Sequence, residues 1–331
     1  MGAALPRPSV ACDSKPGVKT PPMPDIVISE FMDEAAVARF AAQYDTLYDP
    51  AMVDDPVRLV AELADARAVV VRNRTQVNTA LLDAGPKLVA VGRLGVGLDN
   101  IDTAGCAARN IAVLPATGAN AVAVAEYVLG AALSLVRAPG LSVTGAVATG
   151  AWPRGRAIGG ELQGRVMGLL GFGGIAQLVA ARARVFGMEI IAHDPHLPAD
   201  DPAWAEATAA DFDTLITRAD VLSLHVPLTD QTRGLIGAET LGKMKPSAVV
   251  INTARGGIVD ELALAASLHA GTLAGAALDV FAEEPAPAAA HFEGLANLIL
   301  SPHIAGVTAE ANVRVSHVTA DNVLRVLDGA A

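Results

Sequence analysis

The sequence predicts an α/β protein whose strands form parallel sheets in two domains. Its 331 residues are enough for two ordinary domains with separate cores. Short apolar runs alternate with helical patterns along most of the chain, which is typical of parallel sheets covered by helices. The alternation occurs in two series, and a glycine-rich turn opens the second one. Together these observations predict one parallel sheet in each series.

The first series begins after an N-terminal arm, residues 1–24, whose proline, serine and lysine content predicts disorder. A strand is expected at 25–29, and a helix follows across 34–44. Further strands, with helical segments between them, are expected at Ala68–Val71, Leu88–Gly92 and Ile111–Val113. A long helix from Asn120 to about Arg137 then leads towards the second series.

The second series starts with a strand, a turn and a helix. Val166–Leu170 is too short for a helix and is bounded by glycine, so it predicts a buried strand. The next six residues have the pattern G-x-G-x-x-A. Gly171 permits the tight turn, Gly173 lets the backbone approach a pyrophosphate, and Ala176 allows close packing between helix and strand.

This turn predicts a dinucleotide-binding site, because free N–H groups at a helix start bind phosphate. A second strand, Met188–His193, is followed by Asp194, where an acid can bond a ribose 2′-hydroxyl and disfavour a 2′-phosphate. The alternative is a tight strand–helix turn without a ligand, but the strand, helix and acid together favour the dinucleotide. The turn residues expected to contact it are Gly171, Phe172, Gly173, Gly174 and Ile175.

The later part of the second series predicts four more strands and a terminal helix. The strands are expected at Val221–His225, Ala248–Asn252, Ala274–Asp279 and Leu298–Leu300, and the helix at Ala309–Leu327. A lone terminal helix often packs on an earlier domain, so we expect the first domain to be discontinuous in sequence.

Composition restricts the class of protein. A net charge of −11 argues against a general nucleic-acid-binding surface. Cys12 and Cys106 are too few for a disulfide framework and suit a reducing cytosol, so a cytoplasmic location is expected. The most apolar helical run, 119–135, contains Asn120 and Glu126 and predicts a buried helix rather than a membrane span.

Three polar residues follow predicted strands of the second series. Arg255 could clamp a carboxylate, or lie in a surface salt bridge. Glu284 could orient a histidine if it were buried, or belong to a charged loop. His303 could move a proton, although a lone histidine is more often structural. Because ligands bind at the carboxyl ends of parallel strands, the combination predicts hydride transfer involving a 2-keto acid.

The chain resembles the D-isomer-specific 2-hydroxyacid dehydrogenases, especially the phosphoglycerate dehydrogenase branch. The resemblance covers Asp25 to the end, although Gly174 and Ala176 stand where the family often has Arg or Asn and a third glycine. It rests on seven segments in the family's order: GRLGVGLDNID (Gly92–Asp102), GANAVAVAEYVLG (Gly118–Gly130), GLLGFGGIA, HVPLTDQTRGLI (His225–Ile236), NTARGGIVDE (Asn252–Glu261), LDVFAEEP (Leu278–Pro285) and SPHIAG (Ser301–Gly306).

The resemblance implies two Rossmann-like or flavodoxin-like domains with the active site in the cleft between them. A substrate domain is implied at 25–118 plus 307–331, an NAD domain at 119–306, and a homodimer built around the helix after Asn120. No additional regulatory domain of the phosphoglycerate type is expected. The implied catalytic residues are Arg255 as substrate clamp, Glu284 as histidine partner and His303 as acid/base. Further cofactor-binding residues implied are Val226, Pro227, Thr232, Thr253, Ala254, Asp279 (on the carboxamide), His303 and Ala305.

The substrate is the least defined part of the prediction. The resemblance places the Gly95–Val96 backbone on the substrate carboxylate and Arg72, Asn73 and Arg74 near its distal end. Two arginines there could bind phosphate, sulfonate or a second carboxylate, or simply be solvated.

The predicted protein is an NAD-dependent enzyme that interconverts a small 2-hydroxy acid, of R configuration, and its 2-keto acid. The first substrate considered is 3-phosphoglycerate, followed by sulfolactate and then glyoxylate or hydroxypyruvate. The rival from another class is an NAD-sensing protein like the corepressor relatives of this fold. Neither a metal nor a nucleic-acid or membrane partner is expected.

Overall fold

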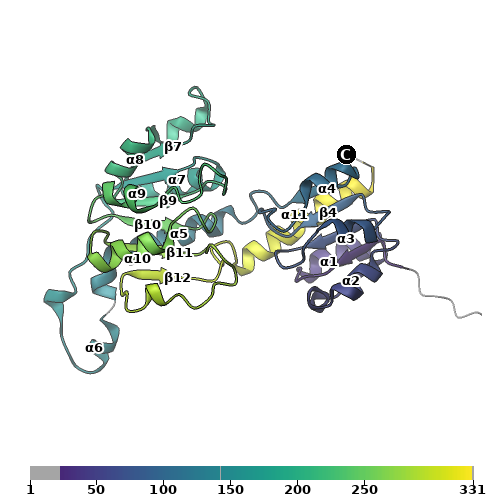
Figure 1. Cartoon of the computed structure of the whole chain (residues 1–331), viewed down its shortest axis with the longest axis horizontal. Helices are drawn as coiled ribbons and strands as arrows, with labels where there is room; N and C mark the ends of the chain where they lie inside the picture. Colours follow the sequence, from purple (N-terminus) through teal and green to yellow (C-terminus); the bar gives the residue numbers. More distant parts are fainter. Residues whose placement is uncertain (1–22, 142, 330–331) are drawn as a thin grey trace, which may run out of the picture.

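The computed structural model describes residues 23–141 and 143–329, and these form two parallel sheets with helices on both faces (Figure 1). The arm predicted for residues 1–24 lies outside the described residues except for its last two positions. The two α/β sheets confirm the predicted fold class.

The five-stranded sheet has the order β2-β1-β3-β4-β5, with every neighbouring pair parallel. Apolar residues alternate between its two faces, so both faces are buried. Helices α1 and α11 cover one face, and α2, α3 and α4 cover the other. The bounds are β1 Ile26–Ile28, β2 Thr46–Tyr48, β3 Ala68–Val71, β4 Ala90–Arg93, β5 Ala112–Pro115, α1 Glu34–Ala41, α2 Pro56–Glu62, α3 Thr79–Ala84, α4 Thr103–Ala108 and α11 Ala309–Leu327.

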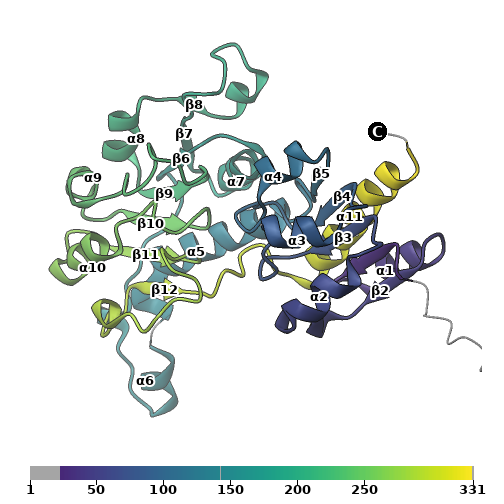
Figure 2. The same cartoon turned by 45° about the vertical axis from the view of Figure 1, so that its right-hand side comes forward.

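The last helix, α11, returns to this first sheet. It contacts α1, β4 and β5, and both views show its yellow ribbon along the purple and blue strands (Figures 1 and 2). Thr308 starts the helix, because its hydroxyl accepts a hydrogen bond from the Ala311 N–H. The terminal helix thus packs on the sheet of the first series.

The seven-stranded sheet has the order β12-β11-β10-β9-β6-β7-β8 and is also parallel. Helices α5 and α7 cover one face, and α8, α9 and α10 cover the other. The bounds are β6 Val166–Leu170, β7 Glu189–His193, β8 Thr208–Ala209, β9 Val221–Leu224, β10 Val249–Asn252, β11 Gly275–Leu278, β12 Leu298–Leu300, α5 Ala121–Leu141, α6 Thr144–Ala148, α7 Gly174–Val185, α8 Phe212–Arg218, α9 Ala238–Lys243 and α10 Glu261–Ala270.

The strand order creates a switch point beside β6. From β6 the chain proceeds outward to β7 and β8, and then returns to the other side of β6 as β9. Ligands of open parallel sheets bind at the carboxyl ends of the strands that flank such a point. The glycine turn follows β6 directly, so it lies at this position.

Helix α5 is apolar enough to be examined as a membrane span. By length and composition alone, Ala121–Ala138 qualifies, and it is the one such helix among the described residues. Half of that segment is buried, and α5 packs against α7, β10 and β11. A core helix gives the same signal, so the signal is weak.

The strands that the sequence missed are short and lie near sheet edges. Strand β2 has three residues at one edge of its sheet, and β8 has two residues at an edge of the other. The first helix ends at Ala41 rather than Tyr44, and α5 continues to Leu141.

Candidate active site

The glycine turn presents an uncapped helix start next to open space. Gly173 is the N-cap of α7, and no side chain caps this helix. A Cβ placed on Gly173 or Gly174 would meet no heavy atom within 4 Å. Free N–H groups with room in front of them fit a pyrophosphate. The side chain of Phe172, in contrast, points into the core and stacks on Trp204 with ring centroids 5.4 Å apart.

Gly171 brings the turn against the neighbouring strand. Its φ of +86° lies in the left-handed region, and a Cβ here would come within 2.6 Å of the His225 carbonyl oxygen and 3.0 Å of Val226. The imidazole of His225 is buried beside Ser223, at 2.9 Å, and burial lowers its pKa to about 4. At neutral pH the His225 side chain is therefore uncharged, and the residue packs against the glycine turn.

Asp194 lies at the end of β7, where both of its carboxylate oxygens accept hydrogen bonds from backbone N–H groups. Oδ2 accepts a hydrogen bond from the Phe172 N–H, and Oδ1 accepts one from the His196 N–H, both at 2.9 Å. Each carboxylate oxygen has a second acceptor position, so a ribose hydroxyl could still be bound. The carboxylate thus links the second strand to the glycine turn.

The other predicted cofactor residues differ in their surroundings. Thr253 and Ala254 directly follow β10, and the Thr253 hydroxyl is buried with no hydrogen-bond partner in the described part of the chain. An unpartnered buried hydroxyl at the carboxyl end of β10 fits a ligand group. Thr232, in contrast, is half-buried in an exposed turn, and its hydroxyl donates to the Pro227 carbonyl oxygen.

His303 and Glu284 contact each other directly. The His303 Nδ1 lies 2.7 Å from Glu284 Oε2. Because a carboxylate only accepts hydrogen bonds, Nδ1 carries the proton, and Nε2 remains for exchange with a substrate. Glu284 is exposed rather than buried, so the condition of burial considered from the sequence is not met.

Asp279 holds the turn that carries His303. It is 1% exposed and accepts hydrogen bonds from the N–H groups of Ile304 and Ala305 and from the Ser301 hydroxyl. Three of the four acceptor positions of its carboxylate are thereby used. One position remains for a carboxamide, the ligand group that the resemblance implies.

Arg255 follows β10 and reaches the loop after β4. Its Nε lies 3.1 Å from Asp99 Oδ2, and its Nη1 donates to the Ala254 carbonyl oxygen at 2.6 Å. The sequence left a carboxylate clamp and a salt bridge as alternatives, and in this structure a carboxylate of the protein itself binds Arg255. A carboxylate ligand of the same geometry would therefore suit the guanidinium.

Gly256 lets the Arg255 loop touch the loop that carries Glu284. A Cβ on Gly256 would lie 1.6 Å from the Phe281 carbonyl oxygen, which no side chain can tolerate. The Glu284 loop in turn contacts the His303 turn. The structure thus joins the three predicted catalytic residues through consecutive loop contacts at one edge of the sheet.

The two predicted distal arginines have different environments. Arg72 is half-buried, and its Nη2 donates to the Asn312 side chain on α11. Burial lowers its pKa, while nearby Glu30 acts in the opposite direction. Arg74 is exposed and pairs with Asp54, which raises its pKa. Arg74 therefore matches the solvated alternative, as does the exposed Asn73, whereas Arg72 does not.

Two charged residues that the sequence analysis missed complete this edge. Arg93 ends β4 and is 9% exposed, and burial lowers its pKa to about 10 while Glu30 opposes the shift. Arg72 and Arg255 also lower that pKa, so the three cations lie close enough to interact. Glu30 follows β1 and accepts the N–H groups of Arg72, Arg74 and Thr75. Both residues stand at strand ends, a signal that was present in the sequence.

The implied carboxylate-binding backbone lies beside Arg93. The Gly95 N–H donates to the Arg93 carbonyl oxygen at 2.8 Å, so it is already used. Val96 is exposed, and within the described residues its N–H has no partner. Of the two groups, the Val96 N–H is the one available to a substrate.

The arrangement combines an uncapped helix start, a histidine with a carboxylate partner and three interacting arginines. The comparisons with known proteins agree with this chemistry. A family model described as D-isomer specific 2-hydroxyacid dehydrogenase, NAD binding domain, matches residues 129–305.

Two relatives and one solved structure extend the match over most of the chain. It is 55% identical over 306 residues to (S)-sulfolactate dehydrogenase of Chromohalobacter salexigens, covering 92% of this chain and 99% of that protein. It is 38% identical over 312 residues to D-3-phosphoglycerate dehydrogenase of Mycobacterium leprae, covering 93% of this chain but 57% of that protein. A glyoxylate reductase structure from Paecilomyes thermophila matches with a TM-score of 0.81 and 26% identity, covering 92% and 95% of the two chains.

The matched segment contains the glycine turn, Asp194, Arg255, Glu284 and His303. The chain therefore belongs to the D-isomer-specific 2-hydroxyacid dehydrogenases, NAD-dependent oxidoreductases that interconvert 2-hydroxy acids and 2-keto acids.

Proposed function

We propose that the substrate is a 2-hydroxy acid with a second anionic group, and that sulfolactate is the first candidate. The observation that carries the proposal is the interaction of Arg72, Arg93 and Arg255. One arginine is enough for a carboxylate, so two further guanidinium groups in the same region favour a second anion. The 55% identity to an (S)-sulfolactate dehydrogenase favours sulfonate over phosphate, the group first considered from the sequence.

The balance of charged side chains in the site favours a substrate that carries one carboxylate and one singly charged group, such as a sulfonate. Glu30 and Asp99 act on Arg93 in the opposite direction to the two other arginines. Three cations and two carboxylates leave a small positive excess when the site is empty. Arg93 uses its Nε and Nη1 on the Gly97 and Leu94 carbonyl oxygens, and its other guanidinium N–H groups are left for an anion.

Bound NAD⁺ supplies the hydride acceptor, and residues of this chain position the acid and move the proton. Arg255 binds the carboxylate and polarises the oxygen on C2, exchanging its bond to Asp99 for one to the substrate. His303 takes the hydroxyl proton on Nε2 as hydride leaves C2. Glu284 holds the Nδ1–H and stabilises the imidazolium that results. In the reverse direction His303 returns this proton to the keto oxygen.

The expected configuration is the D arrangement. For phosphoglycerate-like acids this arrangement has the descriptor R, as predicted from the sequence. In sulfolactate the sulfur-bearing carbon outranks the carboxyl carbon, so the same spatial arrangement takes the descriptor S. An (S)-sulfolactate substrate and the predicted D specificity are therefore compatible.

A kinetic panel tests the proposal. Sulfolactate, 3-phosphoglycerate and lactate are oxidised with NAD⁺, and sulfopyruvate and glyoxylate are reduced with NADH. We expect kcat/KM to be about 100-fold or more higher for acids with a distal anion, as for a bidentate charged contact. Equal values for sulfopyruvate and glyoxylate would refute the second-anion site. No turnover with any acid, despite NAD binding, would favour an NAD-sensing protein.

An Arg72→Met variant locates the second anion. Methionine keeps an unbranched stem and removes the guanidinium group, so KM for sulfolactate should rise while glyoxylate reduction is unaffected. Arg74→Met is the matched control, because Arg74 pairs with Asp54 at the surface. If Arg74→Met raised KM and Arg72→Met did not, the anion would lie elsewhere.

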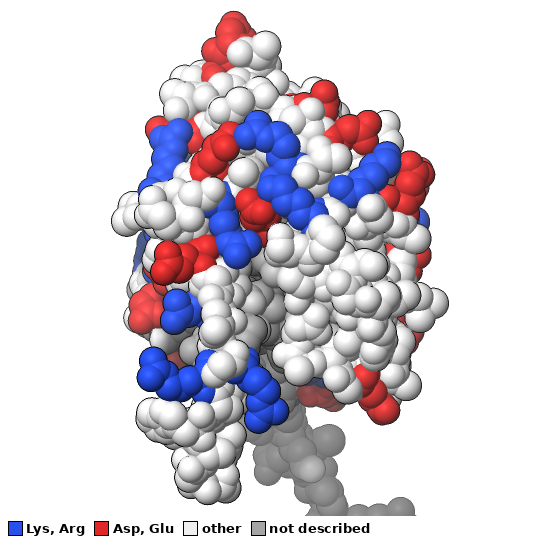
Figure 3. Space-filling view, turned by 90° about the vertical axis from the view of Figure 1, so that its left-hand side faces the viewer, with Lys and Arg blue, Asp and Glu red and all other residues white. Residues whose placement is uncertain are grey.

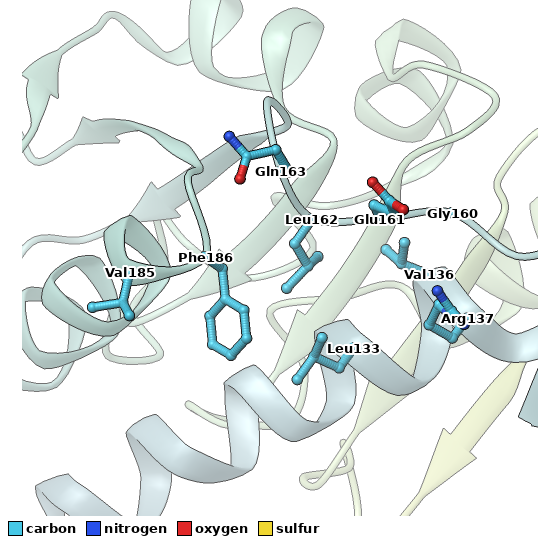
Figure 4. Close-up of a pocket in the computed structure, with 9 residues that line it drawn as sticks. All are labelled: Leu133, Val136, Arg137, Gly160, Glu161, Leu162, Gln163, Val185 and Phe186. Carbon is cyan, nitrogen blue, oxygen red and sulfur yellow. The ribbon is translucent and has the colours of Figure 1, made fainter.

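A homodimer is also part of the proposal. The segment 143–158 projects from the body of the larger sheet, and it exposes Val147, Trp152 and Ile158 (Figures 1 and 2). A cavity of about 530 Å³ lies beside the C-terminal half of α5, between Leu133 and Phe186 (Figure 4). Apolar groups left open on both elements support burial against a second copy.

The cytoplasm is the proposed location, and nucleic acids and membranes are not proposed as partners. On the side of the molecule shown in Figure 3, Lys and Arg residues are interspersed with Asp and Glu. Ion pairs between elements of the larger sheet, such as Arg218–Glu189 and Arg184–Glu206, also mix the two signs of charge. A mixed surface lacks the single-sign field that attracts polyanions.

A further inference from the structure

A chain of hydrogen bonds connects α5 to the residue that holds the His303 turn. The Tyr127 hydroxyl, from the N-terminal third of α5, lies 2.5 Å from Ser301 Oγ. Ser301 Oγ donates to Asp279 Oδ1 at 2.6 Å. Because a hydroxyl has one proton and a carboxylate only accepts, Tyr127 must be the donor to Ser301. The bonds therefore run in one direction, from Tyr127 through Ser301 to Asp279.

Asp279 connects this chain to three consecutive amides. Its carboxylate accepts the N–H groups of Ile304 and Ala305, and its carbonyl oxygen accepts the His303 N–H, all at 2.8 Å. The carboxylate is buried, so its orientation depends on the donors around it. Removing one donor would let the carboxylate rotate and would disturb the remaining bonds.

The turn needs this support because of its backbone conformation. His303 has a φ of +55°, a region that residues with a Cβ rarely adopt. This conformation places the imidazole 2.7 Å from Glu284. If the turn relaxed to extended backbone, the imidazole would leave its carboxylate partner.

We propose that Tyr127 and Ser301 are positioning residues for proton transfer, which act through Asp279 to keep His303 in its left-handed turn. The inference rests on the proposed role of His303 as acid/base. Burial raises the pKa of Tyr127, so its hydroxyl keeps its proton at neutral pH and remains a donor. Tyr127 thereby makes the core helix of the larger sheet part of the catalytic machinery.

The test compares Tyr127→Phe and Ser301→Ala with matched variants of the full-length chain. Tyr44→Phe is the control, because it also removes a tyrosine hydroxyl bonded to an aspartate, Asp328, on the other sheet. Ser301→Thr keeps a hydroxyl and serves as the conservative rescue. Two measurements are made on each: steady-state kinetics with deuterated and protonated acid, and amide hydrogen exchange of residues 301–307 without ligand.

In Tyr127→Phe and Ser301→Ala we expect kcat to fall about two- to ten-fold, the range for one lost hydrogen bond. KM for the acid should stay unchanged, since neither residue belongs to the group of arginines proposed to bind the substrate. The deuterium isotope effect on kcat should rise, because the chemical step limits turnover more strongly. Amides 303–305 should exchange faster in both variants, whereas Tyr44→Phe and Ser301→Thr should match the wild type.

The outcomes separate this inference from the function on which it rests. His303→Ala with wild-type turnover would refute the role of His303 itself, whatever Tyr127→Phe does. If His303→Ala is inactive but Tyr127→Phe keeps wild-type kcat or wild-type amide exchange, the positioning inference is wrong. Should Ser301→Ala fail to fold, Tyr127→Phe, which changes one oxygen atom, decides alone.

Discussion

At the scale of single residues, the site contains buried charged groups whose state is controlled by specific neighbours. Arg93 keeps its charge at neutral pH despite burial, because its pKa falls only to about 10. Glu30 uses its carboxylate on three backbone N–H groups and so shapes the turn that presents Arg72. Asp194 connects the glycine turn to the end of β7.

Asp194→Ala should shift the cofactor preference. The substitution removes the acceptor for a ribose hydroxyl and the charge that repels a 2′-phosphate. KM for NAD should rise about ten-fold, and the ratio of NADP to NAD efficiency should increase by a similar factor, as for one charged hydrogen bond. The control is Asp200→Ala, an exposed acid in the loop after β7. An unchanged ratio in Asp194→Ala would contradict the assignment.

His225 should make the unfolding free energy depend on pH. Its pKa is about 4 in the folded chain, against an ordinary value of 6.5 for histidine, so the unfolded chain binds more protons between these values. Stability from this group is complete above pH 6.5 and decreases as pH falls towards about 4. In urea titrations at pH 7 and pH 5, His225→Gln should lose less stability than the wild type. An equal loss in both would assign the pH dependence to other groups.

At the scale of elements, the catalytic edge is built from loops that touch in sequence. The loop after β10 contacts the loop after β11 at Gly256, and the latter contacts the turn after β12 through Glu284. Helix α5 contacts the last of these turns through the hydrogen bond between Tyr127 and Ser301. The placement of the side chains at this edge therefore depends on four separate segments: helix α5 and the loops after β10, β11 and β12.

Gly256→Ala should separate two of these loops. The new methyl group would overlap the Phe281 carbonyl oxygen, so the Arg255 loop must move away. If Arg255 is the substrate clamp that we propose, a displacement near 1 Å lowers kcat/KM about 100-fold. Gly242→Ala in α9 is the matched control, because a Cβ there meets no heavy atom within 4 Å. Kinetics and thermal melting of both variants check the expectation, and equal kcat/KM would contradict it.

The sequence predicted the long, strongly patterned elements well. Buried parallel strands such as β3 and β6 have apolar runs with sharp polar or glycine boundaries, and their bounds match the prediction. Edge strands β2 and β8 are too short to show a period. For these, pairing with a neighbour decides the conformation, and pairing is not visible in a single segment.

The site was predictable where one segment contains its own signal. Arg255, Glu284 and His303 each follow a recognisable strand, and the structure brings the loops that carry them into contact. Arg93 and Glu30 also follow strands, but their importance depends on β1, β3 and β4 being neighbours. Tyr127 was hidden for another reason: its ring belongs to an apolar helix, and only the folded chain shows where the hydroxyl points.

At the scale of the whole molecule, the larger sheet leaves apolar groups uncovered on one side. Trp152 is 75% exposed in the projecting segment. The α5 cavity is lined by residues that precede β6 and β7, at the amino ends of the strands, whereas His303 follows the carboxyl end of β12. A second copy that covers these groups would not obstruct the catalytic edge.

Trp152→Ala should weaken the proposed dimer. Loss of a large aromatic anchor costs an interface about 2 kcal/mol or more, which raises the dissociation constant about 30-fold. Sedimentation velocity across a dilution series measures the shift towards monomer. Val57→Ala removes a similarly exposed apolar side chain from α2 and should leave the distribution unchanged. A wild-type chain that sediments as a monomer at all concentrations would refute the dimer.

Because Arg255 already pairs with Asp99, a substrate carboxylate that binds Arg255 must replace the Asp99 carboxylate. Asp99 is tethered to the chain, so it competes with every arriving carboxylate at a fixed, high local concentration. The measured affinity is then the difference between two similar ion pairs, and the net charge at Arg255 changes little when the acid enters. Under the proposed function, such a site would discriminate by what Asp99 cannot offer, namely the oxygen on C2 and a distal anion bound by Arg72 and Arg93.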